Sequence, residues 1–345
     1  MVWTGRRRWL AGLTVAVAVV TTGACSTTPI EQTQSSVPAA AHLRNGPSVA
    51  TLPQADVVPV TTNPTPTLPV TVDSVGHGKV TVTDVSRIIA VDRNGTLGNI
   101  VFSLGLGPRV VGRDTSTAFP SAMNLPLVTN RGHTLNAESV LDLHPTVVLV
   151  DQQTIPPQAV DQVRASGIPV VAFPSTRTIA STPQLIRSVA AALGVVRAGE
   201  LLATRTNDQI ADAKKRVPSP SGDPTIAFVY IRGPRLVLLA GPGSGADDLI
   251  GALGGRDAGT EAGLSGAFTA ISAEAMVKAD PDVLLVMTQG AESVGGVEGV
   301  LKLPGIAETQ AGRNRRVVEM DETEVLAFGP DVGGVLGALA RSIYT

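Results

Sequence analysis

The sequence has little of several residue types, and each scarcity excludes a class of protein. One cysteine in 345 residues excludes a disulfide framework and a cysteine-based zinc or iron–sulfur centre. Aromatic residues make up 3% of the chain, so an aromatic cage for a sugar or a stacking platform for bases is not expected. The formal net charge is −2, which argues against nucleic acid as a partner, because neutralising phosphates requires a basic surface.

The apolar content is nevertheless high enough for folded domains. Hydrophobic residues make up 43% of the chain and charged residues 16%, which excludes wholesale disorder. A chain of this length has room for about two domains of ordinary size.

The first 24 residues have the organisation of a bacterial export signal. Arginines at 6–8 precede an apolar run at 10–20 that is too short to cross a bilayer. Small residues then precede Cys25, a pattern that resembles a lipobox; this implies that Cys25 is lipidated and that the protein lies on the extracytoplasmic face of the cell membrane. A plain secretory signal with an incidental cysteine is the alternative. Residues 25–66, rich in Ser, Thr and Pro, predict a flexible, lipid-anchored tether.

Beyond residue 66, short apolar runs alternate with helical patterns. Strands are predicted at 87–91, 147–150, 170–173, 226–230, 236–240, 283–287 and 317–319. Helices are predicted at 95–105, 136–143, 156–166, 181–215, 245–253, 272–279 and 330–343. This alternation predicts an α/β fold with mainly parallel sheets.

An internal repeat relates residues 135–150 to residues 271–286 at a constant offset of 136. Each copy has a polar residue before a short helix, a glutamate in the first helical turn, a proline after the helix and a buried strand. The repeat predicts a bilobal protein with a cleft between two α/β lobes. We expect an N-terminal lobe at 67–176 and a C-terminal lobe at 218–345, joined by one long helix within 177–217.

The body resembles the helix-linked substrate-binding proteins of ABC importers over about 67–345. The segments that carry this resemblance are 82–92, 95–97, 104–107, 110–114, 253–255, 327–330 and the last helix. Within that class, the GHTLNAE motif at 132–138 and the YIRG motif at 230–233 resemble the haemin-binding lipoproteins of actinobacteria (HmuT type).

The resemblance implies a binding protein rather than an enzyme. It would capture ferric haem b in the cleft between the lobes and deliver it to an ABC permease dimer with its ATPase, for haem and iron uptake. Haem-donor surface proteins would be partners upstream. A ferric siderophore or cobalamin, carried on the same fold, is the alternative ligand.

The resemblance also implies that His133 and Tyr230 bind the haem iron from opposite faces. A neutral imidazole is a good ligand for haem iron, and tyrosinate is an anionic ligand that favours the ferric state. Because residues i and i+2 share one face of a strand, Arg232 is expected beside Tyr230, donating to its phenolate oxygen. The alternatives are an ordinary strand tyrosine, a surface arginine and a histidine at a helix entry.

Glu138 and Glu274 lie at matching positions of the repeat. In the importer class, one glutamate from each lobe faces arginines of the permease, so the resemblance implies permease docking by this pair. The alternative is structural, since the helix dipole favours a glutamate in a first turn.

Other motifs predict no further chemistry. Residues 241–246 satisfy G-x-G-x-x-A, but the tight turn at 232–235 predicts an antiparallel hairpin where a dinucleotide fold needs parallel strands. The helix start after this motif is instead expected to receive a carboxylate, such as a haem propionate. No G-x-S-x-G, H-E-x-x-H or Walker motif supports an enzyme. His42 and His77 form no metal-ligand motif with carboxylates or other histidines in the sequence, and His144, which precedes a proline at a helix end, is expected to be structural.

Overall fold

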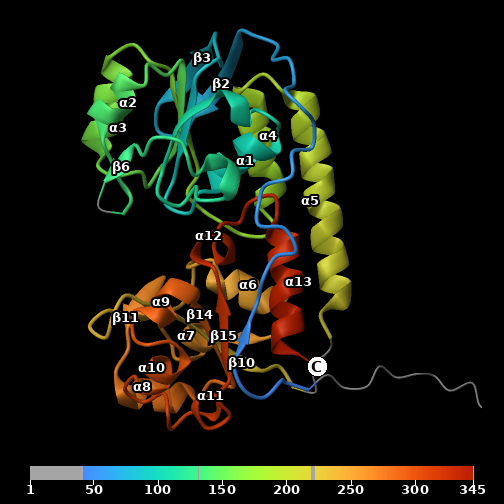
Figure 1. The fold of residues 1–345 in the computed structure, drawn as a ribbon, viewed down its shortest axis with the longest axis vertical. Helices are drawn as coiled ribbons and strands as arrows, with labels where there is room; N and C mark the ends of the chain where they lie inside the picture. Colours follow the sequence, from blue (N-terminus) through green and yellow to red (C-terminus); the bar gives the residue numbers. More distant parts are fainter. Residues whose placement is uncertain (1–41, 131, 219–221, 345) are drawn as a thin grey trace, which may run out of the picture. The chain divides into compact units, whose positions relative to one another are not determined.

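The computed structural model describes residues 42–130, 132–218 and 222–344 (Figure 1). The predicted signal and Cys25 lie outside these residues. The described chain contains a four-stranded sheet, a seven-stranded sheet and two small hairpins. None of its helices combines the length and the apolar character needed to span a membrane.

The four-stranded sheet is parallel throughout, in the order β5 (Val110–Arg113), β4 (Ile88–Val91), β8 (Val147–Asp151) and β9 (Val170–Phe173). Side chains alternate between its faces: Ile88 packs with α1 (Thr96–Ser103), and Ile89 packs with α2 (Ala137–Asp142) and α3 (Pro157–Ala165). Burial on both faces explains why these strands are continuous apolar runs in the sequence.

Smaller elements surround this sheet. They are the hairpin β2 (Val70–Ser74) and β3 (Gly78–Val82), the hairpin β6 (Thr129–Asn130) and β7 (Thr134–Leu135), and the short helices η1 (Gly107–Arg109) and η2 (Pro120–Ala122). The β6–β7 hairpin matters for the site because its turn contains His133.

The seven-stranded sheet is mixed, in the order β1 (Ser48–Val49), β15 (Val317–Met320), β14 (Val283–Met287), β10 (Thr225–Ile231), β11 (Val237–Ala240) and β13 (Phe268–Ala270), with β12 (Arg256–Asp257) also on β10. The pairings of β11 with β10 and with β13 are antiparallel and the others are parallel. The predicted α/β fold with mainly parallel sheets is therefore confirmed.

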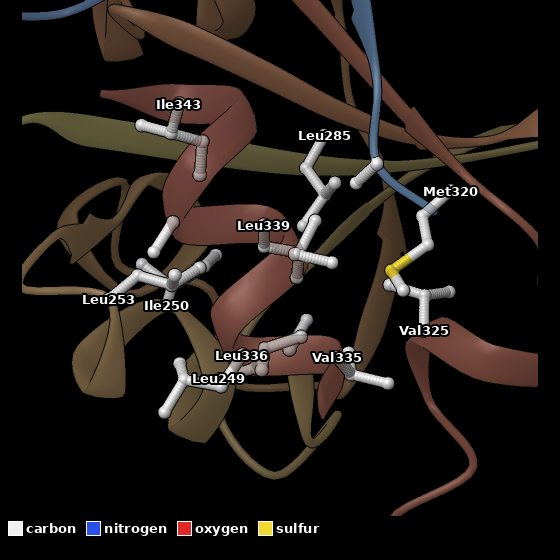
Figure 2. Packing of buried hydrophobic residues seen from close by; sticks show 14 of the residues in the cluster. Leu249, Ile250, Leu253, Leu285, Met320, Val325, Val335, Leu336, Leu339 and Ile343 are labelled. Carbon is white, nitrogen blue, oxygen red and sulfur yellow. The ribbon is translucent and has the colours of Figure 1, made fainter. Parts of the chain in front are cut away.

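Helices cover both faces of the mixed sheet. On one face, α6 (Ala246–Ala252) and α13 (Val332–Ile343) bury an aliphatic core in which Leu336, Leu339 and Ile343 face α6 and the strands (Figure 2). The opposite face carries α7 (Ala258–Glu261), α8 (Ala273–Ala279), α9 (Thr288–Glu292), α10 (Val297–Leu301) and α11 (Gln310–Arg313). The short helix α12 (Glu322–Val325) adds Val325 to the first core.

A long linking helix within 177–217 is present as predicted, as α5 (Val196–Arg216), but the helical pattern predicted over 181–215 is interrupted, because Thr182–Ala192 forms a separate helix, α4. Gly194 separates them at a φ of +69°, a left-handed conformation that ends a helix. The 21 residues of α5 extend for about 31 Å. Its first half adds Leu202 to the core of the parallel sheet, and its second half adds Ile210 to the core of the mixed sheet. One helix thus belongs to both cores.

The prediction of a flexible tether at 25–66 is wrong for the part that the structure describes. Residues 42–66 run along the folded body (Figure 1). Strand β1 pairs with β15, and Ala50 lies in the core of the mixed sheet. Farther along, the Val60 amide donates to the Ser103 carbonyl at 2.8 Å, beside the parallel sheet. The segment is rich in Ser and Thr on average, so its few apolar residues were overlooked. These residues pack against both halves, and their burial holds the segment on the folded body.

The internal repeat is confirmed as a repeated structural unit, α2 with β8 and α8 with β14. Asn136 and Ser272 each accept a hydrogen bond from the backbone amide three residues ahead and so cap the two helices. At the other ends, His144 and Asp280 adopt positive φ values of 45° and 36°. The shared requirement is a residue that tolerates this left-handed conformation, which explains why a histidine aligns with an aspartate.

Candidate functional site

A cavity of about 690 Å³ is lined by residues from both sheets. Arg93 and Arg177 follow the carboxyl ends of β4 and β9, and Asp151 is the last residue of β8. The opposite wall contains the loop 243–245, the start of α6, Phe268 and Leu326. Ligands of α/β proteins bind beyond the carboxyl ends of the strands, and this volume is in the range of small-molecule sites.

His133, in the turn between β6 and β7, is not part of this cavity's lining and lies beside a smaller pocket. It is half-buried, and its Nδ1 atom lies 3.5 Å from Ser116 Oγ. His133 lines a small pocket together with Arg93 and Gln153, two residues that also line the main cavity. The imidazole is therefore next to the space that a ligand would occupy.

The surroundings of His133 favour the neutral imidazole. Burial lowers its pKa most, and the positive charges of Arg93 and Arg232 lower it further, against an opposing effect of Asp92. Arg232 belongs to the mixed sheet's half of the molecule, so the predicted site residues of the two halves are close enough to interact electrostatically. A neutral imidazole has the free nitrogen lone pair that binds a metal.

Tyr230 does not itself line the cavity but contacts the opposite wall through an aromatic pair. It is half-buried near the end of β10, with the fully buried Ile231 on the opposite face of the strand. The Tyr230 and Phe268 ring centroids are 5.9 Å apart in an edge-to-face arrangement. Phe268 lines the main cavity. The sequence analysis missed Phe268, although an aromatic residue is a notable signal in a chain with six phenylalanines.

Arg232 lies beside Tyr230, but in a different arrangement from the one predicted. Its guanidinium carbon is 4.8 Å from the centroid of the Tyr230 ring, which is the geometry of a cation–π contact. The guanidinium donates to the Ile231 carbonyl at 2.9 Å and lies 3.5 Å from Glu322 Oε1. These two acceptors hold the cation over the ring face, so the expected donation to the phenol oxygen is replaced by stacking.

A buried ion-pair cluster forms part of the cavity wall, and the sequence analysis did not identify it. Arg177 Nη2 lies 3.2 Å from Asp92 Oδ2 and 3.4 Å from Asp151 Oδ2, and the three side chains are 6%, 1% and 6% exposed. Arg177 also donates through Nε to Thr96 Oγ1, which in turn donates to the Ala327 carbonyl. Each member ends or follows a buried strand, which is the signal that could have revealed it.

The carboxyl groups around this cluster have raised pKa values. Burial raises the pKa of Asp114 to about 7, and the negative charge of Asp92 adds to the effect. Burial also raises the pKa of Asp151, with Asp92 again adding and Arg177 opposing. The one positive charge of Arg177 therefore does not balance the carboxylates of Asp92, Asp114 and Asp151.

Further hydrogen bonds connect the two halves around the cavity. The bonds are Asn94 Nδ2 to the Leu326 carbonyl (3.0 Å), Thr182 Oγ1 to the Phe328 carbonyl (3.0 Å) and the Ile179 amide to Asp248 Oδ2 (2.6 Å). The first two contacts hold the 326–328 segment of the C-terminal half, and the third holds α6, against the segments that follow β4 and β9.

The helix start after the glycine-rich motif does not have the predicted role. The Gly243 and Gly245 amides donate to the two Asp247 carboxylate oxygens, both at 2.9 Å. An internal carboxylate therefore takes the place expected for a ligand carboxylate. The predicted hairpin is confirmed, because β10 and β11 are antiparallel, with Val229 paired to Leu239.

The remaining predicted residues lie away from the cavity. Glu138 and Glu274 are exposed in the first turns of α2 and α8. Within the described residues, no group of three or more His, Cys, Asp or Glu side chains is arranged to hold a metal ion.

Comparisons with known proteins place this geometry in context. A model of the periplasmic binding protein family matches residues 94–324. No curated protein sequence matches the chain.

Solved structures of haem-binding proteins are similar to the chain. The crystal structure of the haem-binding protein HmuT has 38% identity and a TM-score of 0.83, covering 87% of this chain and 98% of its own. The periplasmic haem-binding protein RhuT from Roseiflexus sp. RS-1, in its apo form, has 38% identity and a TM-score of 0.71, covering 75% and 98%. The periplasmic protein BhuT, in complex with two haems, has 34% identity and a TM-score of 0.68, covering 74% and 97%.

Structures of HmuT variants match this chain equally well. Three of them carry alanine in place of one histidine, one tyrosine or one arginine, with TM-scores of 0.83 to 0.84. In that protein the tyrosine and the arginine are two positions apart, as Tyr230 and Arg232 are here.

Proposed function

The chain belongs to the periplasmic binding protein family, whose members are binding components of transport systems and not enzymes, and on this premise we propose that it captures ferric haem and delivers it to an ABC permease. The observation that supports this most directly is that His133 and Tyr230, from opposite halves, are each one contact away from the cavity. His133 lines a pocket that shares Arg93 and Gln153 with the cavity, and Tyr230 packs on Phe268, which lines the cavity. The similarity to haem-binding proteins at 38% identity points to the same ligand.

In this proposal His133 and Tyr230 are the axial ligands of the haem iron. Burial and neighbouring arginines favour the neutral imidazole that a metal requires. Tyr230 would bind through its phenol oxygen, and the Arg232 guanidinium lies 4.8 Å from the centroid of its ring. Phe268 packs against the Tyr230 ring and would limit its rotation.

The proposed carrier has two lobes, at about 67–176 and 218–345, with α5 joining them. Residues 42–50 contribute to the second lobe through β1. We propose that Cys25 carries the lipid that anchors the protein to the extracytoplasmic face of the cell membrane, and that the bacterium is an actinobacterium. Haem-donor surface proteins would supply the ligand.

Glu138 and Glu274 are proposed as the two permease contacts. They occupy equivalent first-turn positions of the repeated unit, one in each lobe, and both are exposed. Two equivalent carboxylates suit a permease dimer that presents one basic surface per half, with its ATPase on the cytoplasmic side.

Haemin titration followed by visible absorption tests the haem proposal. Tyr230→Phe removes the phenol oxygen and keeps the ring that packs on Phe268 and Arg232. We expect it to alter the haem spectrum and to weaken ferric haem binding by more than the roughly 10- to 100-fold that outer-shell partners of metal sites contribute. His133→Ala should weaken binding less, because it removes a neutral ligand and leaves the anionic one.

Tyr344→Phe is the matched control. Tyr344 is buried and donates to the Leu253 carbonyl at 2.6 Å, away from the cavity. The control should keep the wild-type haem spectrum. An unaltered spectrum in Tyr230→Phe would contradict the ligand assignment, and purified protein coloured by a siderophore or cobalamin would identify the alternative ligand.

A further inference from the structure

We propose that Arg93 is the carboxylate-binding residue of this cavity and holds a propionate group of the haem. The inference rests on the proposed function and extends it to the orientation of the ligand. Three arginines, Arg93, Arg177 and Arg232, lie at the cavity or affect the charge around it.

Two of these arginines already have partners. Arg177 is buried between Asp92 and Asp151. Arg232 is held by Glu322 and stacks on Tyr230. Neither guanidinium is available to a ligand carboxylate without losing an existing contact.

Arg93 differs from both. It is exposed, it lines the main cavity, and it also lines the small pocket beside His133. Over residues 42–130, 132–218 and 222–344, its guanidinium forms no ion pair with an acidic side chain. It is therefore a cation at the cavity that is free to bind an anion.

The backbone around Arg93 is fixed by contacts on three sides. Ser116 Oγ donates to the Arg93 carbonyl at 2.6 Å, and Asn94 Nδ2 donates to the Leu326 carbonyl at 3.0 Å. Gly95 has a φ of +71°, and a Cβ there would lie 2.7 Å from the Ser116 carbonyl oxygen. Only glycine fits this tight turn, which presents the Arg93 side chain from a rigid base.

The opposite wall repels carboxylates. Asp247 accepts from the amides of the glycine-rich loop, and Asp248 accepts from the Ile179 amide, so both acidic side chains line the cavity. Haem b has two ionised propionates, and arginine binds a carboxylate through two parallel hydrogen bonds. Asp151 also lines the cavity on the side of Arg93, but it is paired with Arg177. The unpaired Arg93 is therefore the cation toward which the charge distribution directs the propionate edge, away from α6.

The experiment compares haemin with haemin dimethyl ester, in which both propionates are neutral. Absorption titrations would use the wild type, Arg93→Ala, Arg93→Lys and Arg197→Ala, the last being an exposed arginine on α5 that lines no cavity described here. We expect Arg93→Ala to weaken haemin binding by on the order of 10- to 100-fold, the range for a hydrogen bond to a charged group. Its affinity for the ester should equal that of the wild type.

Haemin and its dimethyl ester contain the same iron and differ only in their carboxylates. A variant that weakens binding of haemin alone therefore affects carboxylate binding, and one that weakens binding of both compounds affects iron coordination or the cavity. Arg93→Lys should recover part of the haemin affinity, and Arg197→Ala should bind both ligands as the wild type does. Equal weakening of haemin and ester in Arg93→Ala, or no weakening of either, would overturn the role of Arg93 while leaving haem binding intact. Failure of the wild type to bind either ligand would overturn the proposed function, and Arg93 with it.

Discussion

Replacing Arg177 with methionine should destabilise the fold strongly, because it leaves two buried carboxylates without their positively charged partner. The guanidinium lies 3.2 Å from Asp92 and 3.4 Å from Asp151, and these side chains are 1% and 6% exposed. Removing one partner of a buried ion pair costs about 3–5 kcal/mol, since the remaining charge has lost both water and its counterion. With two such carboxylates, we expect a loss in the free energy of unfolding near the upper end of that range.

An exposed arginine provides the matched control. Arg187 Nε lies 2.9 Å from Glu200, a shorter distance than in the buried cluster, but these side chains are 35% and 55% exposed. Exposed ion pairs contribute about 0–1 kcal/mol, because water screens the charges. Arg187→Met should therefore cost at most about 1 kcal/mol, and the comparison isolates burial from distance.

The cost of Arg177→Met should also depend on pH. Burial and Asp92 raise the pKa of Asp151, while Arg177 lowers it. Without Arg177 the folded-state pKa rises further above the unfolded value, so the folded state resists ionisation more strongly. Stability is then lost as the pH rises from the unfolded pKa through the folded pKa. The penalty should be largest at pH 7 and above, and smaller near pH 4.

Urea unfolding followed by far-UV circular dichroism, at a series of pH values, measures both effects. Dichroism is preferable to tryptophan fluorescence because both tryptophans lie within the first ten residues. Equal losses for Arg177→Met and Arg187→Met would refute the argument from burial. A loss of stability in Arg177→Met that did not change with pH would refute the argument that it comes from unpaired, buried carboxylates.

Three further predictions concern other parts of the chain. Burial raises the pKa of Glu324 from 4.5 to about 7, with Asp321 and Asp331 adding to the effect, so the folded state loses stability as the pH rises through that interval. Glu324→Gln should therefore add roughly 1–2 kcal/mol above pH 7, after allowance for screening, and nothing near pH 4, as denaturation at the two pH values will report. Cys25→Ala should release the protein from the membrane fraction, which immunoblotting of fractionated cells measures. Combined Glu138→Ala and Glu274→Ala should leave haemin titrations unchanged and reduce haem uptake by cells, whereas normal uptake would favour a purely structural role.

The repeat and the central strands could be predicted from the sequence for one physical reason. Strands buried on both faces have no solvent side, so β9 and β14 are uninterrupted apolar runs whose bounds match the predicted ones, 170–173 and 283–287. The helix caps at Asn136 and Ser272 are also local signals, because each involves a side chain and an amide three residues away.

The break in the predicted linking helix depends on information that a local pattern lacks. Gly194 lies in an apolar periodicity that continues on both sides, and a single glycine is tolerated within many helices. In the structure a Cβ at this position would lie 2.6 Å from the Thr67 carbonyl oxygen. The conformation is therefore fixed by a segment more than a hundred residues away, immediately after the region whose composition suggested a tether.

The arrangement at the site was likewise only partly predictable. The two-residue spacing correctly indicated that Arg232 lies beside Tyr230, although Arg232 follows Ile231, the last residue of β10, and is not on the strand itself. The position of the guanidinium over the ring depends on Glu322, which is 90 residues away in sequence. The Arg177 cluster joins residues that are 85 and 26 positions apart, so its assembly required the fold.

Two connections between the halves bear on how the cavity selects its ligand. Helix α5 contributes to both cores, and the segment 42–66 pairs with the mixed sheet before it contacts the parallel one. A wide opening would have to break core contacts in both places, which cost about 25 cal/mol for each Å² of apolar surface exposed. The protein would then select its ligand mainly through side chains that are already in position before the ligand binds. In our proposal these are two iron ligands beside the cavity, one from each half, an unpaired Arg93 on one wall, and carboxylates on the other that oppose a reversed, propionate-first orientation.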